Sequence, residues 1–487
     1  MNKIELLFNL IKSFTKSEKR YFKLLTQMHS GEKGFVILYE LLDESKHFDE
    51  SLKIKLKNVF KGDSIEPARK YLYKLLMKSL RLFEEENNVE NKLSNLVNDC
   101  KILFAKGHLK LYEEQLEKAQ KMALKYEKYT YFQILARLEL QNLVRSQFNN
   151  LDENQLIQKQ TQLKEIIKHE LLLHEHASLY EILLFRYLRN GIVRSKEGKD
   201  KLNDLLLEET QILQKSRLKS FESQKLHLNF QSAYFMMIGS HKGSLQVYYE
   251  LNDLFRKNPE LWSDNPINYI YVLDGILTDL TEMERLSDID FFLEALATIA
   301  LEFKNVSAVG KTLHFIHRIN QLIAQKEIEK AVIFWNDSVE DIKKMTQQLP
   351  SGLQVEFRFA NARLLYFAKK YSLALKEVNF IFDEYLKVLS ASQYSECRIL
   401  NLMIHYELRN FDYLTYALQS LERKLKLEKR FYAIEQFIIK VFRNILNDKK
   451  LSIRLQKEYK SIAENPYNQS IIRKLSLNKW VDLHLKI

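Results

Sequence analysis

Helix-breaking residues are nearly absent from this chain, and their scarcity is the strongest constraint on its fold. Only 11 glycines and 5 prolines occur in 487 residues, whereas these two types make up about 12% of an average protein. Tight hairpin turns and flexible linkers depend on such residues. Hydrophobic residues account for 46% of the chain and charged residues for 28%, which is enough for a buried core and a charged surface. The composition therefore predicts long helices.

Amphipathic runs begin at a nearly regular spacing along the chain. Their starts lie 40 to 47 residues apart, and a second helix of similar length fits between each pair. A chain of this length forms either several globular domains or one repeat array, and the regular spacing favours the array. The starts are His108, Asp152, Lys199, Gly243, Ser287, Glu327, Tyr371 and Phe411.

Short motifs at these starts resemble the tetratricopeptide family. Tyr371-Ser-Leu-Ala374 and Ile328-Glu-Lys-Ala331 resemble the opening of the second helix of a tetratricopeptide unit, and Gly239–Leu245 resembles the turn before it. The resemblance covers roughly residues 90 to 450. It implies an all-α fold, a right-handed α-solenoid of about eight helical hairpins. The unit is longer than the ~34 residues of a tetratricopeptide and overlaps the HEAT range, so a HEAT-like geometry stays open.

The first part of the chain does not follow the repeat and predicts a small helical module. Helices are expected over residues 18–28, 35–44, 51–60 and 67–85. Thr15 and Glu18 have the spacing of a capping box at the first of these helices. We therefore expect three regions, which are a basic N-terminal module over residues 1–88, the repeat array over 89–450 and C-terminal capping helices over 451–487.

Positive charge is concentrated at the two ends of the chain. The net charge is +12, of which residues 1–81 contribute +7 and residues 423–487 contribute +10, so the middle carries −5. The last helix of the N-terminal module interleaves basic residues with leucines, as a DNA-recognition helix does. An ordinary solvated amphipathic helix has the same spacing. The candidate nucleic-acid-binding residues are Arg69, Lys70, Lys74, Lys78 and Arg81.

One polar pattern recurs with a uniform offset of 40 residues. An arginine and an asparagine three positions apart share a helix face, and an arginine can hold a carboxylate or phosphate with two parallel hydrogen bonds. The pattern is a candidate partner-binding surface in the groove of the array. Alternatively, the same residues tie neighbouring hairpins together. They are Arg358, Asn361 and Tyr366, repeated as Arg398, Asn401 and Tyr406.

No motif indicates catalysis or a metal. His169-Glu170-Leu-Leu-Leu-His174 has one residue more than a zincin motif, so its two imidazoles lie on different helix faces. His169 and His176 do share a face, but a structural site needs four convergent ligands. The glycines at 191 and 198 are too far apart for a phosphate-binding loop. We therefore predict a protein that is not an enzyme and that uses no cofactor and no metal.

These patterns favour binding over catalysis. Cys100 and Cys397 form no CxxC pair, and neither an export signal nor a membrane span is recognisable, so we expect a cytoplasmic protein. The leading hypothesis is a scaffold or adaptor that binds a protein or peptide in the solenoid groove. The alternative is a regulator whose basic N-terminal helices contact nucleic acid while the repeats act as a sensor. Thr15–Lys23 and Lys70–Arg81 also resemble uncharacterised bacterial repeat proteins, a resemblance that implies no activity.

Overall fold

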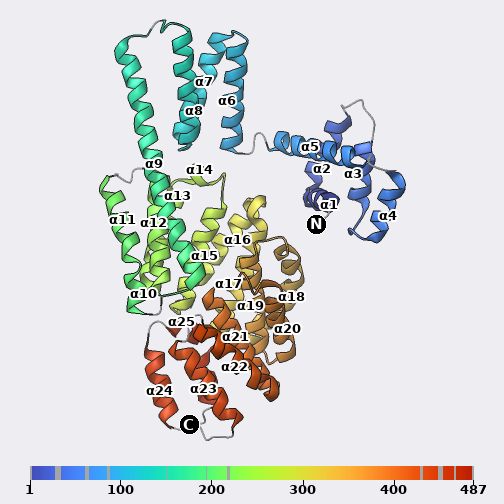
Figure 1. Ribbon diagram of the computed structural model, residues 1–487, viewed down its shortest axis with the longest axis vertical. Helices are drawn as coiled ribbons and strands as arrows, with labels where there is room; N and C mark the ends of the chain where they lie inside the picture. The colour runs from blue at the N-terminus through green and yellow to red at the C-terminus, as the bar shows by residue number, and fades with distance from the viewer. Residues whose placement is uncertain are drawn as a thin grey trace. The chain divides into compact units, whose positions relative to one another are not determined.

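The described residues form helices and no strands, which confirms the predicted all-α class (Figure 1). None of these helices combines the length and the apolar character that crossing a lipid bilayer requires. The chain divides into two compact units, residues 1–164 and 165–487. The computed structural model describes residues 3–27, 34–60, 65–84, 88–149, 151–193, 195–215, 220–427, 432–447, 453–465 and 468–484.

The first five helices share one apolar core within the first unit. Ile11, Leu38 and Leu72 are completely buried in it. The predicted capping box is present, since the Thr15 amide donates to Glu18 Oε2 at 2.6 Å and the Glu18 amide donates to Thr15 Oγ1 at 3.2 Å. The five helices are α1 (Lys3–Ser13), α2 (Lys16–Gln27), α3 (Gly34–Glu44), α4 (Glu50–Val59) and α5 (Ile65–Phe83).

Three antiparallel neighbours follow in the same unit. These are α6 (Val89–Ala105), α7 (Leu109–Lys125) and α8 (Tyr129–Arg145), and each contacts the other two. Their short connections contain Gly107 and Glu127 with positive φ, two residues before the next helix. A positive φ lets the chain reverse immediately after a helix ends.

The ninth helix departs from the expected repeat. A hairpin was predicted between Asp152 and Lys199, but α9 (Glu153–Asn190) is a single helix of 38 residues (Figure 1). The prediction of a turn here is wrong: the helix runs without interruption, and residues 153–190 contain neither glycine nor proline, the residues that most strongly favour a helix end. The division between the two units, after residue 164, falls within this helix.

In the second unit, consecutive helices from α15 to α26 pack together. Each odd-numbered helix from α15 to α21 also packs against the next odd-numbered helix. The helices α15, α17, α19, α21 and α23 therefore form a row. The helices are α10 (Lys196–Asp200), α11 (Asn203–Lys215), α12 (Phe221–Met237), α13 (His241–Lys257), α14 (Pro259–Trp262), α15 (Ile267–Glu282), α16 (Ile289–Glu302), α17 (Ser307–Ala324), α18 (Ile328–Thr346), α19 (Ser351–Phe367), α20 (Tyr371–Tyr385), α21 (Ala391–Glu407), α22 (Phe411–Leu427), α23 (Ala433–Leu446), α24 (Ile453–Glu464), α25 (Gln469–Lys474) and α26 (Leu477–His484).

One turn geometry recurs through this unit. Gly239, Lys326, Lys369 and Arg409 have φ values of 72°, 65°, 59° and 59°. Each lies two residues before the start of α13, α18, α20 or α22. The helix starts predicted at Glu327, Tyr371 and Phe411 are therefore confirmed to within one residue.

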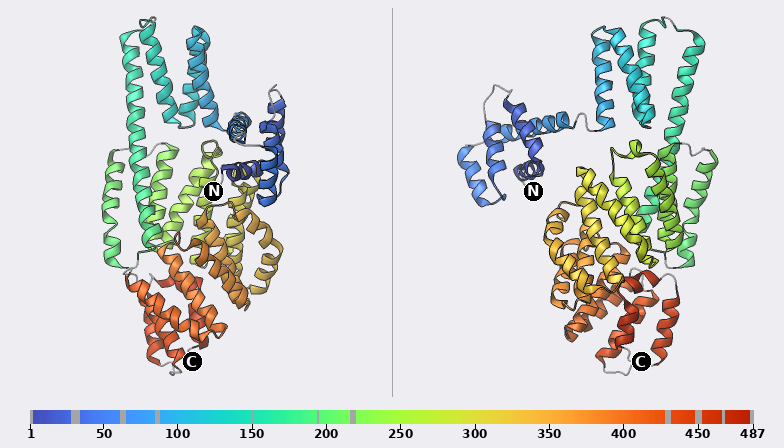
Figure 2. Two further views of the ribbon diagram at one scale, coloured as in Figure 1. Left: turned by 45° about the vertical axis from the view of Figure 1, so that its right-hand side comes forward. Right: turned by 180° about the vertical axis from the view of Figure 1, so that it is seen from behind.

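The C-terminal helices close one end of the apolar core of this unit. Trp480 of α26 packs on Phe442 of α23 with ring centroids 5.0 Å apart, and on Tyr406 of α21 at 6.0 Å. Figure 2 shows these helices, in red, beside α21 to α23 from two sides. Helix α25 also reaches the row of odd-numbered helices, where the candidate site lies.

Candidate functional site

A group of charged and polar residues, several of them buried, gathers where α15, α17, α19 and α21 meet α25. Glu282 and Glu396 are each 6% exposed, Arg363 is 9% exposed and His317 is 4% exposed. A buried charge is costly unless it is paired and hydrogen-bonded, so the contacts of these side chains decide how the site works. The charged cluster, as we name it, comprises Asp274, Glu282, His317, Asn320, Glu356, Arg363, Glu396, Arg473 and Lys474.

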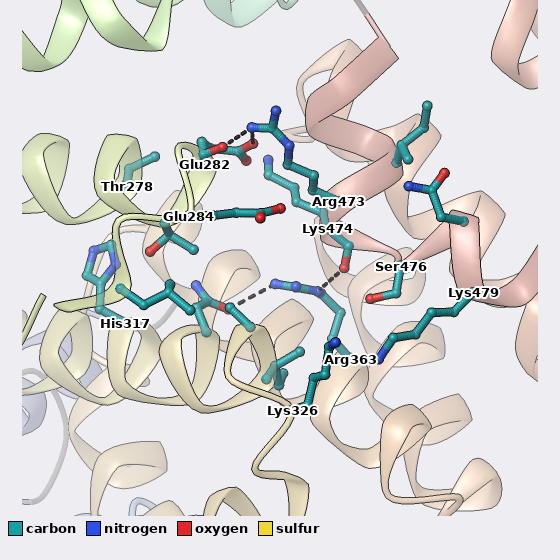
Figure 3. Close-up of a pocket in the computed structure, with 17 residues that line it drawn as sticks. Thr278, Glu282, Glu284, His317, Lys326, Arg363, Arg473, Lys474, Ser476 and Lys479 are labelled. Carbon is teal, nitrogen blue, oxygen red and sulfur yellow. Dashed lines mark hydrogen bonds and ion pairs between the residues drawn. The ribbon is translucent and has the colours of Figure 1, made fainter. Parts of the chain in front are cut away.

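Arg363 joins three helices at the centre of the charged cluster (Figure 3). Its Nη1 donates to Asn320 Oδ1 of α17 at 2.9 Å, and its Nε donates to the backbone oxygen of Lys474 in α25 at 2.7 Å. Burial lowers the pKa of Arg363, while Glu396 and Glu282 act in the opposite direction. The guanidinium stays charged because the pKa of an arginine is so high.

Helix α25 is held by charged and polar contacts. Lys474 Nζ donates to Glu396 Oε1 at 3.1 Å, and Ser470 Oγ donates to Glu282 Oε1 at 3.0 Å. The Arg473 guanidinium donates to the backbone oxygen of Glu282. Burial acts to lower the pKa of Lys474, but Glu396 and Glu282 outweigh it and the pKa is raised. This short helix is therefore bound to α15 and α21 as a cationic segment.

The acidic side of the charged cluster can exchange protons near neutral pH. The helices packed around Glu356 desolvate its carboxyl group, although part of the side chain is exposed, and this desolvation, together with the carboxylates of Asp274 and Glu396, raises its pKa to about 7. His317 Nε2 lies 2.7 Å from Asp274 Oδ1. Its Nδ1 is buried without a hydrogen-bond partner among the described residues, so this atom is available to a ligand.

Two adjoining cavities, of about 370 and 350 Å³, lie on either side of Arg363 and Lys474. The first is basic: Lys326, Arg363, Arg473, Lys474 and Lys479 face Glu282 and Glu284. The second is acidic: Asp274, Glu356 and Glu396 face Arg363 and Lys474. The pair can hold a ligand that has an anionic group beside a cationic or hydrogen-bond-donating group.

The first predicted arginine–asparagine pair lies outside the charged cluster. Arg358 pairs with Glu377 at 2.8 Å and lies 3.9 Å from the ring centre of Phe380, both in α20. Asn361 is 1% exposed and accepts a hydrogen bond from Trp335 Nε1 of α18 at 2.9 Å. These two residues therefore connect α19 to the helices before and after it.

The second pair also contacts the helices before and after its own helix, α21, but with the roles of arginine and asparagine exchanged. The guanidinium of Arg398 lies 3.8 Å from the ring centre of Phe382 in α20. Asn401 is 1% exposed and accepts a hydrogen bond from the Tyr413 hydroxyl of α22 at 3.2 Å. Both pairs of the 40-residue pattern thus contact the helices on either side of their own helix.

The two predicted tyrosines have different surroundings. The Tyr366 hydroxyl donates to Glu407 Oε1 at 3.5 Å, and Tyr366 borders a cavity of about 490 Å³ with Trp480. Tyr406 packs its ring against Phe442 and Trp480. Partner binding by the six predicted residues stays a prediction.

The candidate nucleic-acid-binding residues all lie on α5. Lys70, Lys74, Lys78 and Arg81 are exposed at spacings of four, four and three residues, which places them on one helix face. Arg69 is partly buried and makes a bidentate ion pair with Glu66. Four of the five candidates thus form one basic surface.

Sequence reasoning missed the charged cluster, whose residues come from positions 274 to 474. The available signal was a charged residue inside an otherwise apolar run, as in Ala362-Arg363-Leu364-Leu365. Both cysteines are free and buried, and Cys397 borders the second cavity. No protein-family model, curated protein or solved structure matches this chain.

Proposed function

We propose that residues 165–487 form a right-handed, tetratricopeptide-like α-solenoid that binds an extended segment of a partner protein at the charged cluster. In this proposal the protein is a non-enzymatic adaptor of the cytoplasm. The observation that carries it is the docking of α25, because this row of helices already holds a short polypeptide segment through Ser470, Arg473 and Lys474.

The two cavities indicate the chemistry of the partner segment. The first has five basic against two acidic lining residues, which suits a carboxylate or a phosphate. The second has three acidic against two basic lining residues, which suits a lysine or arginine side chain. A peptide that carries adjacent charges of opposite sign fits both. Small-molecule catalysis has weaker support, since it rests on Glu356 and His317 alone.

Site-specific photo-crosslinking in the native host tests the proposal. A photoreactive phenylalanine replaces Thr278 in one variant and Lys326 in another; both residues are exposed and border the first cavity. We expect the same partner protein to be crosslinked from both positions. Exchanging Lys479 for glutamate should reduce that crosslinking, because it reverses a charge in the basic cavity.

The matched control places the same photoreactive residue at Tyr416, which is 75% exposed and lies on α22. The partner should not be crosslinked from there. Equal crosslinking from Tyr416 and Thr278, or none from either cavity position, would contradict binding at the charged cluster.

A second candidate function is contact with nucleic acid through α5. It is favoured by the exposure of Lys70, Lys74, Lys78 and Arg81 on one face. A duplex that contacts three phosphates there should lose affinity with salt at a logarithmic slope of about −3. Exchanging Lys70, Lys74 and Lys78 for glutamine should remove most of that slope. An affinity for duplex that does not change with salt, or no binding at about 50 mM salt, would eliminate this candidate.

A further inference from the structure

Three ligating side chains from three helices converge in the second unit, away from the charged cluster. His176 of α9, Glu209 of α11 and His227 of α12 each offer one atom, and these atoms all lie within 4.8 Å of one another. His227 Nδ1 is 2.8 Å from Glu209 Oε1, and His176 Nε2 is 3.7 Å from the same oxygen. Among the described residues, this is the group of His, Cys, Asp and Glu side chains with the spacing of a metal site.

The group forms a polar layer inside an apolar core. His176 is 2% exposed and Glu209 is 6% exposed. Glu209 lies between the core residues Leu205 and Ile212 of α11, and His176 lies between Leu172 and Leu179 of α9. A core position of this kind normally carries an apolar side chain, so three polar residues at facing core positions need a physical reason.

Internal hydrogen bonding accounts for only part of the group. His227 and Glu209 are close enough to share a hydrogen bond, but the 3.7 Å between His176 Nε2 and Glu209 exceeds a hydrogen-bond distance. His176 Nε2 is buried and has no hydrogen-bond partner among the described residues. A buried imidazole nitrogen that makes no hydrogen bond and lies 3.7 Å from a carboxylate, with a second imidazole beside it, is an arrangement that a cation would complete.

The two separations from Glu209 are compatible with a small, four-coordinate ion. With bonds of 2.0–2.1 Å to nitrogen and oxygen, ligand atoms around such an ion lie about 3.3 Å apart. The observed 2.8 and 3.7 Å lie on either side of that value. Two imidazoles and one carboxylate suit Zn²⁺ and neighbouring divalent transition metals, whereas Ca²⁺ and Mg²⁺ prefer oxygen ligands alone.

We propose that His176, Glu209 and His227 form a Zn²⁺-binding site that joins α9 to α11 and α12, with water as the fourth ligand. The site is independent of peptide binding at the charged cluster. His169, which shares a helix face with His176 in the sequence, is not part of it, because its Nε2 lies 3.2 Å from Ser220 Oγ.

Metal titration of the full chain tests the site. The protein is prepared without a polyhistidine tag, stripped with a chelator, and titrated with Zn²⁺ against a chromophoric competitor, with Co²⁺ as a spectroscopic probe. We expect one equivalent of Zn²⁺ per chain, and visible Co²⁺ absorption of the intensity typical of four-coordinate sites. Excess Zn²⁺ at about 100 times its Kd should raise the thermal midpoint by about 3–4 °C.

Three variants separate ligation from folding. Glu209→Gln keeps the size of the side chain and its ability to accept a hydrogen bond from His227, and His227→Ala removes one imidazole. Each should weaken Zn²⁺ binding by more than about 100-fold. Even changes to residues that only hydrogen-bond to the metal ligands reduce metal affinity by about 10- to 100-fold. His174→Ala is the matched control, since His174 is exposed on the same helix, and it should bind as the wild type does.

Two results would overturn the site. One is a wild-type chain that takes up no tight equivalent of Zn²⁺, which would make the group a hydrogen-bonded network only. The other is a Glu209→Gln variant that keeps wild-type circular dichroism and wild-type Zn²⁺ affinity, which would place the metal elsewhere on the chain.

Discussion

Helix α5 and the charged cluster use the same kinds of side chain in opposite surroundings. Lys70, Lys74 and Lys78 are exposed, so their charges are hydrated and screened by salt. Arg363, Glu282 and Glu396 are less than 10% exposed, so each depends on partners at fixed positions. The comparison teaches that a charge on α5 can be changed with little effect on folding, whereas a charge in the cluster is part of the packing.

The largest expected difference is between Arg363→Met and Lys74→Met. Arg363 loses hydrogen bonds to Asn320 and to the Lys474 carbonyl, and both acceptors stay enclosed. We expect the free energy of unfolding to fall by about 3 kcal/mol, whereas Lys74→Met should change it by less than about 0.5 kcal/mol. Urea unfolding followed by circular dichroism measures both. If the two variants lost the same free energy of unfolding, the charged cluster would tolerate the loss of a charge as well as the exposed surface of α5 does.

The second prediction concerns pH. The pKa of Glu356 is about 7 in the folded protein, against 4.5 ordinarily, so its contribution to stability is full below pH 4.5 and is lost as the pH rises to 7. Because the Glu356 side chain is itself exposed, solvent screening reduces the loss to about 1–2 kcal/mol. Glu356→Gln should therefore be more stable than the wild type by this amount at pH 8 and equally stable at pH 4. Thermal melts across this range test it, and a constant difference would refute the assigned pKa.

The third prediction compares two capping boxes, one in each unit. Thr15 and Glu18 form the first, and Ser390 and Gln393 form the second. Thr15→Ala and Ser390→Ala should each lower the free energy of unfolding by about 1 kcal/mol. The two effects should be equal because a capping residue acts only on the first turn of its own helix. Ser390 also borders the second cavity. A much larger cost for Ser390→Ala in chemical unfolding would mean that this serine also supports the charged cluster.

The smallest effect is expected on α5 itself. Exchanging Lys70, Lys74 and Lys78 together for glutamine should change the free energy of unfolding by less than about 0.5 kcal/mol. The buried face of this helix, with Leu72, Leu75 and Leu76, is untouched. Differential scanning calorimetry at low and high salt measures the change. A clear loss of stability would show that these lysines have structural partners.

Local features of the fold were predictable from the sequence because short-range physics determines them. The capping box at Thr15 and the starts of α18, α20 and α22 depend on residues within one helical turn. The hairpin between Asp152 and Lys199 was predicted from even spacing alone. It failed at α9 because the regular spacing of helix starts does not show where a helix ends, and α9 runs unbroken from Glu153 to Asn190.

Sites assembled from distant residues were not predictable in the same way. The sequence singled out His176 but compared it with His169 on the same helix. Its partners, Glu209 and His227, lie on other helices, and only packing brings them together. The charged cluster likewise needs α25 beside α15, a contact between residues 188 positions apart in the case of Ser470 and Glu282.

The continuity of α9 also decides how the two units can be studied apart. Its 38 residues extend for about 57 Å at 1.5 Å per residue, and the boundary between the units falls inside it. No loop offers a protease a natural cleavage point there. A fragment that begins at residue 165 would start inside the helix, and the first four backbone N–H groups would have no partner within the helix. A fragment that begins at Leu151 would keep the whole helix. Separate expression of the second unit should therefore start upstream of Glu153, and it would carry part of its neighbour with it.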